Sequence, residues 1–366
     1  MRAINASIMR QVNRKLILNQ IRLRPISRAE LAEITGLTRA SVTQIVEELI
    51  GEGIVVETTM IGRTRLGRRS TQLAIEPASG AVFGVNMSRR ACSVGVMDMA
   101  GTVLAHNAEI VAGRDPADVL DSVAAAILRQ KKELELGDGC VRGVGLCVPG
   151  PVEARDGRLL NPARHPEWKG LPLVKLLEQR LDMPVWVEST ARAQSLAEKY
   201  FGVSGESFAL IRLDDSVSLG VIVRGELYRG AQDFVAELGG CVLSGDGGQT
   251  LNQLISLPAL LAGRPYRSWA ELMERRGEPE AEAAIERLIR YLAPCVAGLM
   301  YVLSIERVVL AGELGAASEG LLPQLNAAVR ARVGLQLAAD PVRTETRLDP
   351  VRIGAAPAFA AFFDAN

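Results

Sequence analysis

Two groups of side chains near the start of the chain have the chemistry to bind a nucleic acid. The first group comprises Arg39, Ser41, Thr43 and Gln44. Arginine can pair with guanine, glutamine with adenine, and the hydroxyls with bases or phosphates. The second group lies within residues 61–69, which hold two glycines, no acidic residue and four arginines: Arg63, Arg65, Arg68 and Arg69. Such a cationic stretch suits the phosphate backbone or the minor groove.

The elements that must position these side chains are two short helices joined by a tight turn. Ser27 and Glu30 form a capping-box pattern that predicts a helix from Arg28 to about Thr35. Gly36 then allows a tight turn, and Thr38 caps a second helix that runs to about Gly51. The spacing of small and apolar residues fits two helices that cross around a shared core, with these members: Leu31, Ala32, Leu37, Val42, Ile45, Val46 and Leu49.

A strand at 53–58 and its return at 72–75 flank the arginine-rich stretch, which completes a winged helix-turn-helix. Ahead of it, residues 6–22 predict an amphipathic helix with Met9, Val12, Leu16 and Ile17 on its apolar stripe. We therefore expect the second helix and the wing to contact DNA. The alternative is a small helical bundle whose exposed side chains and charged loop are simply solvated.

The charge distribution points the same way. Residues 1–72 contain 12 Lys and Arg but only 6 Asp and Glu, whereas the whole chain has a net charge of zero. An uneven charge can also arise by chance. No apolar run is long enough to span a membrane, and the first residues do not resemble a signal peptide, so we expect a cytoplasmic protein. The five cysteines and two histidines lack zinc-site spacing, so we expect no metal.

The rest of the chain alternates strands and helices, which indicates an α/β body in two lobes. Strand patterns at 81–85, 92–97 and 101–104 predict an antiparallel meander. Further strands are expected at 141–148, 184–187, 208–213, 218–223 and 307–310. Helices are expected at 116–136, 172–181, 191–201, 279–304 and 317–333.

Several motifs, taken in order, resemble those of the ROK family, a group of bacterial sugar-responsive repressors and sugar kinases. They are the helix-turn-helix with its wing, the stretch Val144–Val152, residues 161–168 with Leu171-Pro172-Leu173, and Ala236-Glu237-Leu238-Gly239. The resemblance implies an actin-like, ribonuclease-H-like body of two lobes that binds its ligand in a cleft.

The resemblance also implies that this chain has lost the residues for kinase chemistry. The family's kinases carry their catalytic base in a Glu-Asn-Asp stretch, and here it reads Glu188-Ser189-Thr190. Thr190 cannot act as a carboxylate base, and Ser189 or Thr190 is more simply a helix cap. The two phosphate loops read 86–90 and 214–220 and lack most of their glycines. The zinc-site histidine position holds Gly240, and its cysteines are absent.

The resemblance places five residues at the ligand site: His165, Glu188, Ser189, Thr190 and Glu237. His165 could equally be a surface-loop residue, and Arg192 could meet an anionic ligand or form a salt bridge. The cleft would hold a sugar, a related small molecule or nothing, and no cofactor is expected.

These observations favour a DNA-binding domain at 1–76 and a ligand-binding, oligomerising body at 77–366. The leading hypothesis is a transcription regulator of the repressor type that is not an enzyme. It would be a homodimer or a dimer of dimers on a palindromic double-stranded operator, would respond to a sugar and would not contact membranes. One alternative is an ATP-dependent sugar kinase with an accessory DNA-binding domain. Another is a DNA-binding scaffold that needs no ligand.

Overall fold

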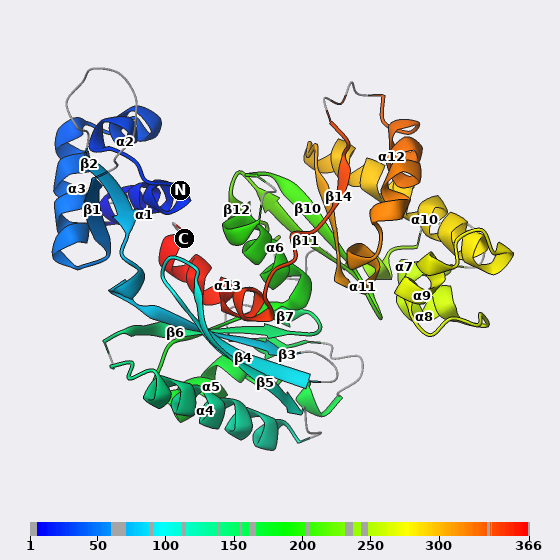
Figure 1. Cartoon of the computed structure of the whole chain (residues 1–366), viewed down its shortest axis with the longest axis horizontal. Helices are drawn as coiled ribbons and strands as arrows, with labels where there is room; N and C mark the ends of the chain where they lie inside the picture. Colours follow the sequence, from blue (N-terminus) through cyan, green and yellow to red (C-terminus); the bar gives the residue numbers. More distant parts are fainter. Residues whose placement is uncertain are drawn as a thin grey trace. The chain divides into compact units, whose positions relative to one another are not determined.

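The computed structural model describes residues 6–59, 71–87, 91–111, 115–137, 139–153, 156–160, 166–202, 205–230, 237–242, 248–334, 337 and 339–364. The chain divides into two compact units, which are drawn together in Figure 1. The first unit comprises residues 1–148, 172–187 and 350–366, and the second comprises residues 149–171 and 188–349.

The first unit begins with three helices and a two-stranded antiparallel sheet: α1 (Ala6–Leu23), α2 (Arg28–Thr35), α3 (Arg39–Gly51), β1 (Val55–Thr59) and β2 (Thr71–Ile75). The capping box predicted at Ser27 and Glu30 is present, and Gly36 adopts a left-handed conformation with φ +69°. The predicted winged helix-turn-helix is therefore confirmed in its described part. The connection between β1 and β2, with all four wing arginines, lies outside the described residues.

The core of this small domain is formed by buried aliphatic residues of all three helices: Ile17, Leu18, Ile21, Leu31, Val42, Ile45, Val46 and Leu49. The helix predicted at 6–22 is confirmed, but only one member of its apolar stripe, Ile17, is buried in this core. The other three, Met9, Val12 and Leu16, are 47%, 41% and 38% exposed. Leu18 and Ile21 complete the buried face of the helix.

The body part of the first unit is a five-stranded mixed sheet in the order β5-β4-β3-β6-β9. Its strands are β3 (Ala81–Met87), β4 (Ala91–Asp98), β5 (Val103–Val111), β6 (Val141–Val148) and β9 (Val185–Ser189). The predicted meander is confirmed, because β3, β4 and β5 pair antiparallel, while β6 runs parallel to β3. The turn helix η1 (Pro77–Ser79) leads into β3.

Helices cover both faces of this sheet. Figure 1 shows α4 (Pro116–Glu133) and α5 (Leu173–Leu181) on one side and α13 (Pro350–Phe363) on the other. Helix α13 lies against β3, β4 and β6 at unusually close range. A Cβ atom on Gly84 would lie 2.7 Å from the amide nitrogen of Ala355, and one on Gly354 would lie 2.7 Å from that of Val85. Glycines on both elements therefore permit this packing.

The second unit repeats the strand order of the first. Its sheet runs β12-β11-β10-β13-β14, from β10 (Phe208–Leu213), β11 (Val217–Val223), β12 (Glu226–Leu227), β13 (Val308–Ala311) and β14 (Val342–Thr344). Three antiparallel strands are again followed by a strand parallel to the first. The pairing β7 (Val152–Glu153) with β8 (Arg158–Leu159) and the turn helix η2 (Pro166–Trp168) precede this sheet in the chain.

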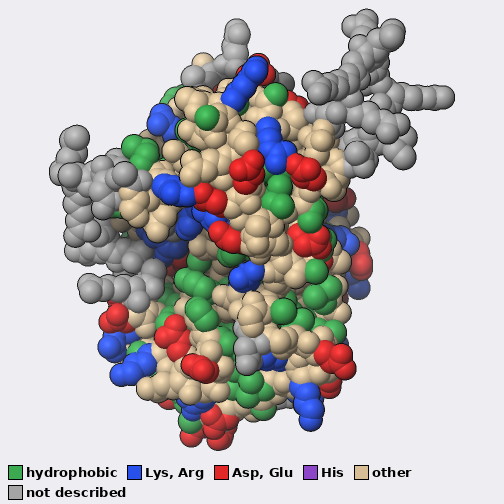
Figure 2. Space-filling view, turned by 90° about the vertical axis from the view of Figure 1, so that its left-hand side faces the viewer, with side chains coloured by type: hydrophobic (Ala, Val, Ile, Leu, Met, Phe, Trp, Pro, Cys, Tyr) green, Lys and Arg blue, Asp and Glu red, His purple; other side chains and the backbone are tan. Residues whose placement is uncertain are grey.

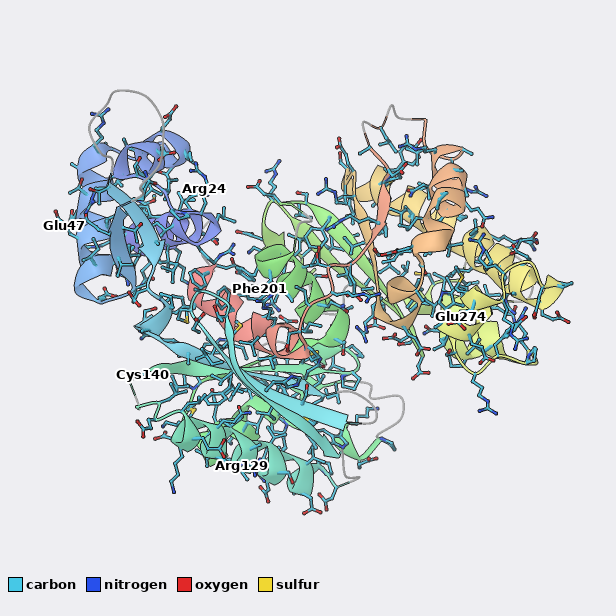
Figure 3. All side chains as sticks on the ribbon, viewed as in Figure 1. Arg24, Glu47, Arg129, Cys140, Phe201 and Glu274 are labelled. Carbon is cyan, nitrogen blue, oxygen red and sulfur yellow. The ribbon has the colours of Figure 1, made fainter. Side chains whose placement is uncertain are left out.

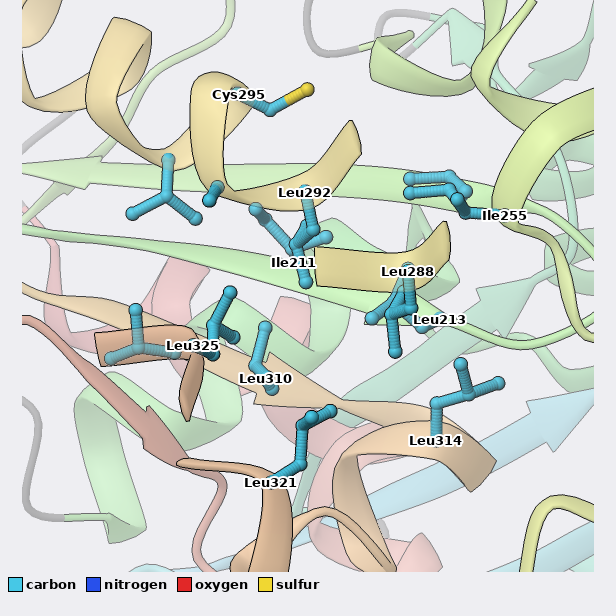
Figure 4. Packing of buried hydrophobic residues seen from close by; sticks show 14 of the residues in the cluster. Ile211, Leu213, Ile255, Leu288, Leu292, Cys295, Leu310, Leu314, Leu321 and Leu325 are labelled. Atoms are coloured by element: carbon cyan, nitrogen blue, oxygen red, sulfur yellow. The ribbon is translucent and has the colours of Figure 1, made fainter. Parts of the chain in front are cut away.

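Helix α6 (Thr190–Phe201) packs against β10 and β11. The opposite side of the sheet is covered by a larger helical layer with α7 (Leu251–Ile255), α8 (Leu257–Leu261), α9 (Trp269–Glu274), α10 (Pro279–Leu303) and α12 (Leu322–Arg330). Figure 4 shows its core, in which Ile211 and Leu213 of the sheet meet Leu288 and Leu292 of α10. The helix predicted at 317–333 is shorter than expected, since α11 (Gly312–Ala316) and η4 (Glu319–Leu321) precede α12. Among the described residues, no helix is long and apolar enough to cross a membrane.

Candidate nucleic-acid interface and effector site

The N-terminal end of α3 presents the predicted base-reading residues. Thr38 caps the helix, because its Oγ1 accepts a hydrogen bond from the amide of Ser41 at 3.2 Å. Arg39 and Gln44 are exposed, whereas Ser41 and Thr43 are half-buried. The Ser41 hydroxyl also lies 2.9 Å from the Thr38 hydroxyl. Arg39 and Gln44 are thus the side chains of this group with most freedom to reach a ligand.

Four other arginines among the described residues of this domain are paired with glutamates. Arg10 of α1 pairs with Glu48 of α3, and Arg14 pairs with Glu52, the residue that follows α3. Arg24 pairs with Glu30, and Arg28 pairs with Glu57. The face seen in Figure 2 accordingly shows basic and acidic side chains interspersed. Arg24 and Glu47, labelled in Figure 3, are both exposed. Within the described part of the chain, Arg39 forms no ion pair of 4 Å or less, so its charge is available to a phosphate or a guanine.

The second unit holds a buried charge cluster at the start of α6. Glu188, whose side chain is 3% exposed, lies 2.9 Å from Arg192 Nε through Oε2 and 2.5 Å from Arg229 Nη2 through Oε1. The Arg192 side chain is equally buried, while that of Arg229 is 38% exposed. The salt bridge that was one of two expectations for Arg192 is therefore present. Glu188 is fixed between two guanidinium groups and is buried as a whole.

Two of the other predicted ligand residues, Ser189 and Thr190, directly follow Glu188 in the sequence, and Glu237 lies farther along the chain. Ser189 occupies the N-cap position of α6 but makes no capping hydrogen bond through its side chain, and Thr190 is the first residue of the helix. Glu237 directly precedes the turn helix η3 (Leu238–Gly240). Desolvation raises the pKa of the Glu237 carboxyl above its ordinary value, although the residue remains exposed. His165 lies outside the described residues.

The position of the second phosphate loop is occupied by a carboxylate. Asp214 follows β10, and its Oδ1 accepts a hydrogen bond from the amide of Glu313 at 2.5 Å, at the start of α11. Its Oδ2 lies 2.6 Å from Arg212 Nη2. Gly312, with φ +82°, has no room for a side chain because a Cβ atom would lie 2.6 Å from Asp214 Oδ1. An anionic side chain thus lies within the stretch predicted as the second phosphate loop and is bonded to the backbone at the start of α11.

A polar network next to this carboxylate was not anticipated from the sequence. Gln194 of α6 accepts a hydrogen bond from Arg212 at 2.6 Å and donates one to Glu345. Burial, opposed by the charge of Arg212, raises the pKa of Glu345 to about 7. Glu198, also on α6, accepts hydrogen bonds from Arg343 and Thr346. The i, i+4 spacing of Gln194 and Glu198 on one helix was the available signal. Of their partners, Arg343 lies in β14 and Glu345 and Thr346 directly follow it, and the sequence did not predict this strand.

Hydrogen bonds hold the described part of the region that the sequence resemblance compares with a zinc site. Thr250 caps α7 in a capping box with Gln253, and Val242 pairs with Thr250 in an isolated β-bridge. The Asn252 side chain accepts a hydrogen bond from the amide of Val217 at 2.7 Å. Among the described residues, His, Cys, Asp and Glu form no group that could hold a metal ion.

The family comparison decides the identity of the body. The model of the ROK family matches residues 82–356, about three quarters of the chain. The chain belongs to the ROK family. The xylose repressor of Caldicellulosiruptor bescii is 30% identical over 239 residues, and that match covers 64% of this chain and 59% of the repressor. The DNA-binding transcriptional dual regulator NagC of Escherichia coli is 26% identical over 359 residues, which cover 89% of this chain and 86% of NagC.

Solved structures of ROK proteins share the fold. A ROK family transcriptional regulator described as a homolog of the E. coli Mlc protein matches with a TM-score of 0.80 and 23% identity and covers 98% of both chains. The ROK hexokinase of Thermus thermophilus matches with a TM-score of 0.65 and 24% identity, covering 98% of the hexokinase but 77% of this chain. The predicted fold class, a winged helix-turn-helix followed by a two-lobed ROK body, is thereby confirmed.

Proposed function

We propose that this ROK protein is a DNA-binding transcription regulator, of the repressor type, controlled by a sugar or a related small molecule. The observation that carries the proposal is the exposed, capped N-terminal end of α3, with Arg39 and Gln44, on a chain that matches a ROK regulator over its whole length. The hexokinase fold leaves about a quarter of the chain unmatched. The DNA-binding domain accounts for a difference of that size.

The same proposal assigns no phosphoryl transfer to the body. Such a reaction needs a carboxylate that accepts the hydroxyl proton of the sugar, and Thr190 at the matching position cannot supply one. A nucleotide also needs backbone amides that face its phosphates. Here the carboxylate of Asp214 already accepts the hydrogen bond of the Glu313 amide, and it would repel a phosphate. ATP is therefore not a ligand in this proposal, and Glu188, buried between two arginines, is structural in the state described.

The effector site in this proposal comprises His165, Ser189, Thr190 and Glu237, together with the buried Glu188. Hydroxyl and carboxylate groups are the usual partners of sugar hydroxyls. Two relatives are named for sugars, as a xylose repressor and as an N-acetylglucosamine repressor, which makes xylose and N-acetylglucosamine the first effectors to test. A homodimer would read two half-sites of a palindromic operator, as helix-turn-helix dimers do.

A mobility-shift assay on the DNA upstream of the chain's own gene tests DNA binding. The wild-type chain should form a sequence-specific complex whose affinity falls steeply with salt, because bound phosphates release counterions. Arg39→Ala should weaken the complex by about 1–3 kcal/mol and Gln44→Ala should change base preference. Arg129→Ala, on the exposed face of α4, is the matched control and should bind as the wild type does. A wild-type chain without any salt-sensitive, specific complex would refute the proposal.

An ADP-release assay with hexoses and amino sugars tests the absence of kinase activity. Thr190→Asp restores a carboxylate at the base position but leaves the Asp214 carboxylate in place. Neither the wild-type chain nor this variant should release ADP above the rate without sugar. Turnover by the wild-type chain that Glu237→Gln abolishes would support a sugar kinase instead.

A further inference from the structure

Helix α1 carries a second apolar face whose side chains are more than a third exposed in the described chain. Ile8, Met9, Val12, Leu16 and Leu23 are 44%, 47%, 41%, 38% and 60% exposed. At 100° per residue, these five side chains fall on one side of the helix, opposite Ile21 in the domain core. A helix that is apolar on two opposite faces is normally buried on both. We call this face the α1 seam.

The spacing within the α1 seam is that of a helix that pairs with another helix. Met9, Val12, Leu16, Asn19 and Leu23 follow one another at intervals of three, four, three and four residues. This heptad pattern keeps one face turned toward a partner, and a polar residue such as Asn19 within it fixes the register. A solvated surface helix has no need for either feature.

We propose that the α1 seam pairs with the α1 seam of a second copy of this chain, so that two DNA-binding domains act as one unit. The inference rests on the proposed function in that two recognition helices read one operator. A two-fold pairing uses the same face on both copies, and a heptad seam is complementary to itself.

The charges around the seam permit this approach. Arg10 and Arg14, on the far side of α1, are paired with Glu48 and Glu52. Lys15, beside the seam, donates a hydrogen bond to the backbone carbonyl of Ala361 at 3.2 Å. Arg22 lies over the ring of Phe363, 5.7 Å from its centroid. These contacts direct the Lys15 and Arg22 side chains toward the C-terminal segment of their own chain rather than across the seam.

The size of the seam decides what the pairing can do. A pair of single helices buries well under the roughly 1,200 Å² of a stable complex, so the seam alone does not hold a dimer. Two chains that are already held together by another contact, or by binding to the same operator, have a high effective concentration, so even the weak contact of the seam can stabilise their pairing. The distance between the two recognition helices in such a pair also suits DNA. Packed helices lie about 8–10 Å apart, so three such steps, from α3 to its own α1, to the partner's α1 and to the partner's α3, separate the two α3 helices by roughly 24–30 Å. This distance is close to the roughly 34 Å helical turn that separates two half-sites.

Cysteine cross-linking of the full-length chain tests the pairing directly. In a background with the exposed Cys140 and Cys241 replaced by serine, Val12→Cys should form an interchain disulfide under mild oxidation. Gln11→Cys is exposed one position away but off the seam, and should link at least about tenfold less. Equal cross-linking of the two variants, or no cross-linking of Val12→Cys, overturns the proposal.

A charge placed in the seam supplies the second readout. Leu16→Glu should weaken binding to the upstream DNA about tenfold or more through loss of cooperativity, whereas Gln11→Glu, the same change of charge off the seam, should weaken it less than about twofold. Circular dichroism melts verify that both variants fold. If the wild-type chain binds no DNA, the proposed function fails while the cross-link still decides the pairing. If DNA binds but the cross-link is absent, only the pairing fails.

Discussion

Glu188 shows how much a single buried carboxylate can matter for the second unit. It balances two guanidinium groups, of Arg192 and Arg229, at a site where its own side chain is 3% exposed. Glu188→Gln would remove the negative charge that both guanidinium groups contact. We expect a loss of about 3–5 kcal/mol in the free energy of unfolding, measured by urea denaturation.

The control for this substitution is an exposed ion pair of the same unit. Asp340, 67% exposed, pairs with Arg330 at 2.9 Å. Asp340→Asn should cost no more than about 1 kcal/mol, because water screens an exposed pair. Similar losses for Glu188→Gln and Asp340→Asn would contradict the role assigned to the buried cluster.

Glu345 makes stability depend on pH near neutrality. Burial raises its pKa from 4.5 to about 7 in the folded chain. The unfolded chain releases this proton at the lower pH and the folded chain keeps it, so the folded state binds more protons between the two values. Stability should therefore fall as pH rises from about 4.5 to about 7, by about 3 kcal/mol in all.

Glu345→Gln removes this ionisation and should flatten the profile. Urea unfolding of the wild type and the variant at pH 5, 6, 7 and 8 should give a difference in unfolding free energy that moves in favour of the variant as pH rises. Glu313→Gln, an exposed glutamate on the neighbouring helix α11, is the matched change and should follow the wild type. A constant difference across these pH values would exclude the assignment.

At the scale of elements, the contact of α13 with its sheet depends on glycine. A Cβ atom on Gly84 would lie 2.7 Å from the Ala355 amide nitrogen, against backbone that cannot give way. Gly84→Ala should cost at least about 2 kcal/mol of unfolding free energy, measured by denaturation. Gly298 of α10 has open space around it, so Gly298→Ala should stabilise by up to about 1 kcal/mol. Destabilisation of equal size by both would show that the helix–sheet distance is not the cause.

Helix α13 also shows where sequence patterns stop. The strands and helices with clear periods were predicted close to their bounds, among them β6, α6 and β10. Helix α13 carries Gly354 and Pro357 in its interior and is buried almost all round, so it has no amphipathic period. Its helical state follows from packing on the sheet, which the sequence cannot report. The apolar stripe on α1 could be recognised in the sequence, but its spacing does not say whether the same chain or a second chain covers it.

The candidate site likewise has features that the sequence predicts and features that only the structure reveals. The proposed loss of a catalytic carboxylate rests on one position of a motif, where the sequence itself shows Thr190. The contact of the Asp214 carboxylate with the Glu313 amide could not be predicted, since it joins residues 99 positions apart. The network of Gln194, Arg212 and Glu345 has the same character. Contacts between distant residues need the fold before they can be predicted.

At the scale of the whole molecule, effector binding and DNA binding must be linked if the proposed function holds. An effector that weakens DNA binding by some factor must itself bind more weakly to the DNA-bound chain by the same factor, which is typically about 5- to 150-fold. A thermal-shift screen with xylose, N-acetylglucosamine and their phosphates should find a sugar that raises the Tm of the free chain, because a ligand of the folded state stabilises it. Titration calorimetry then measures the affinity for the sugar with and without the upstream DNA, and the affinity for that DNA with and without the sugar.

A sugar that raises the Tm but leaves DNA affinity unchanged would show a binding site without a regulatory role. A full screen without any shift in Tm would favour a regulator that needs no ligand.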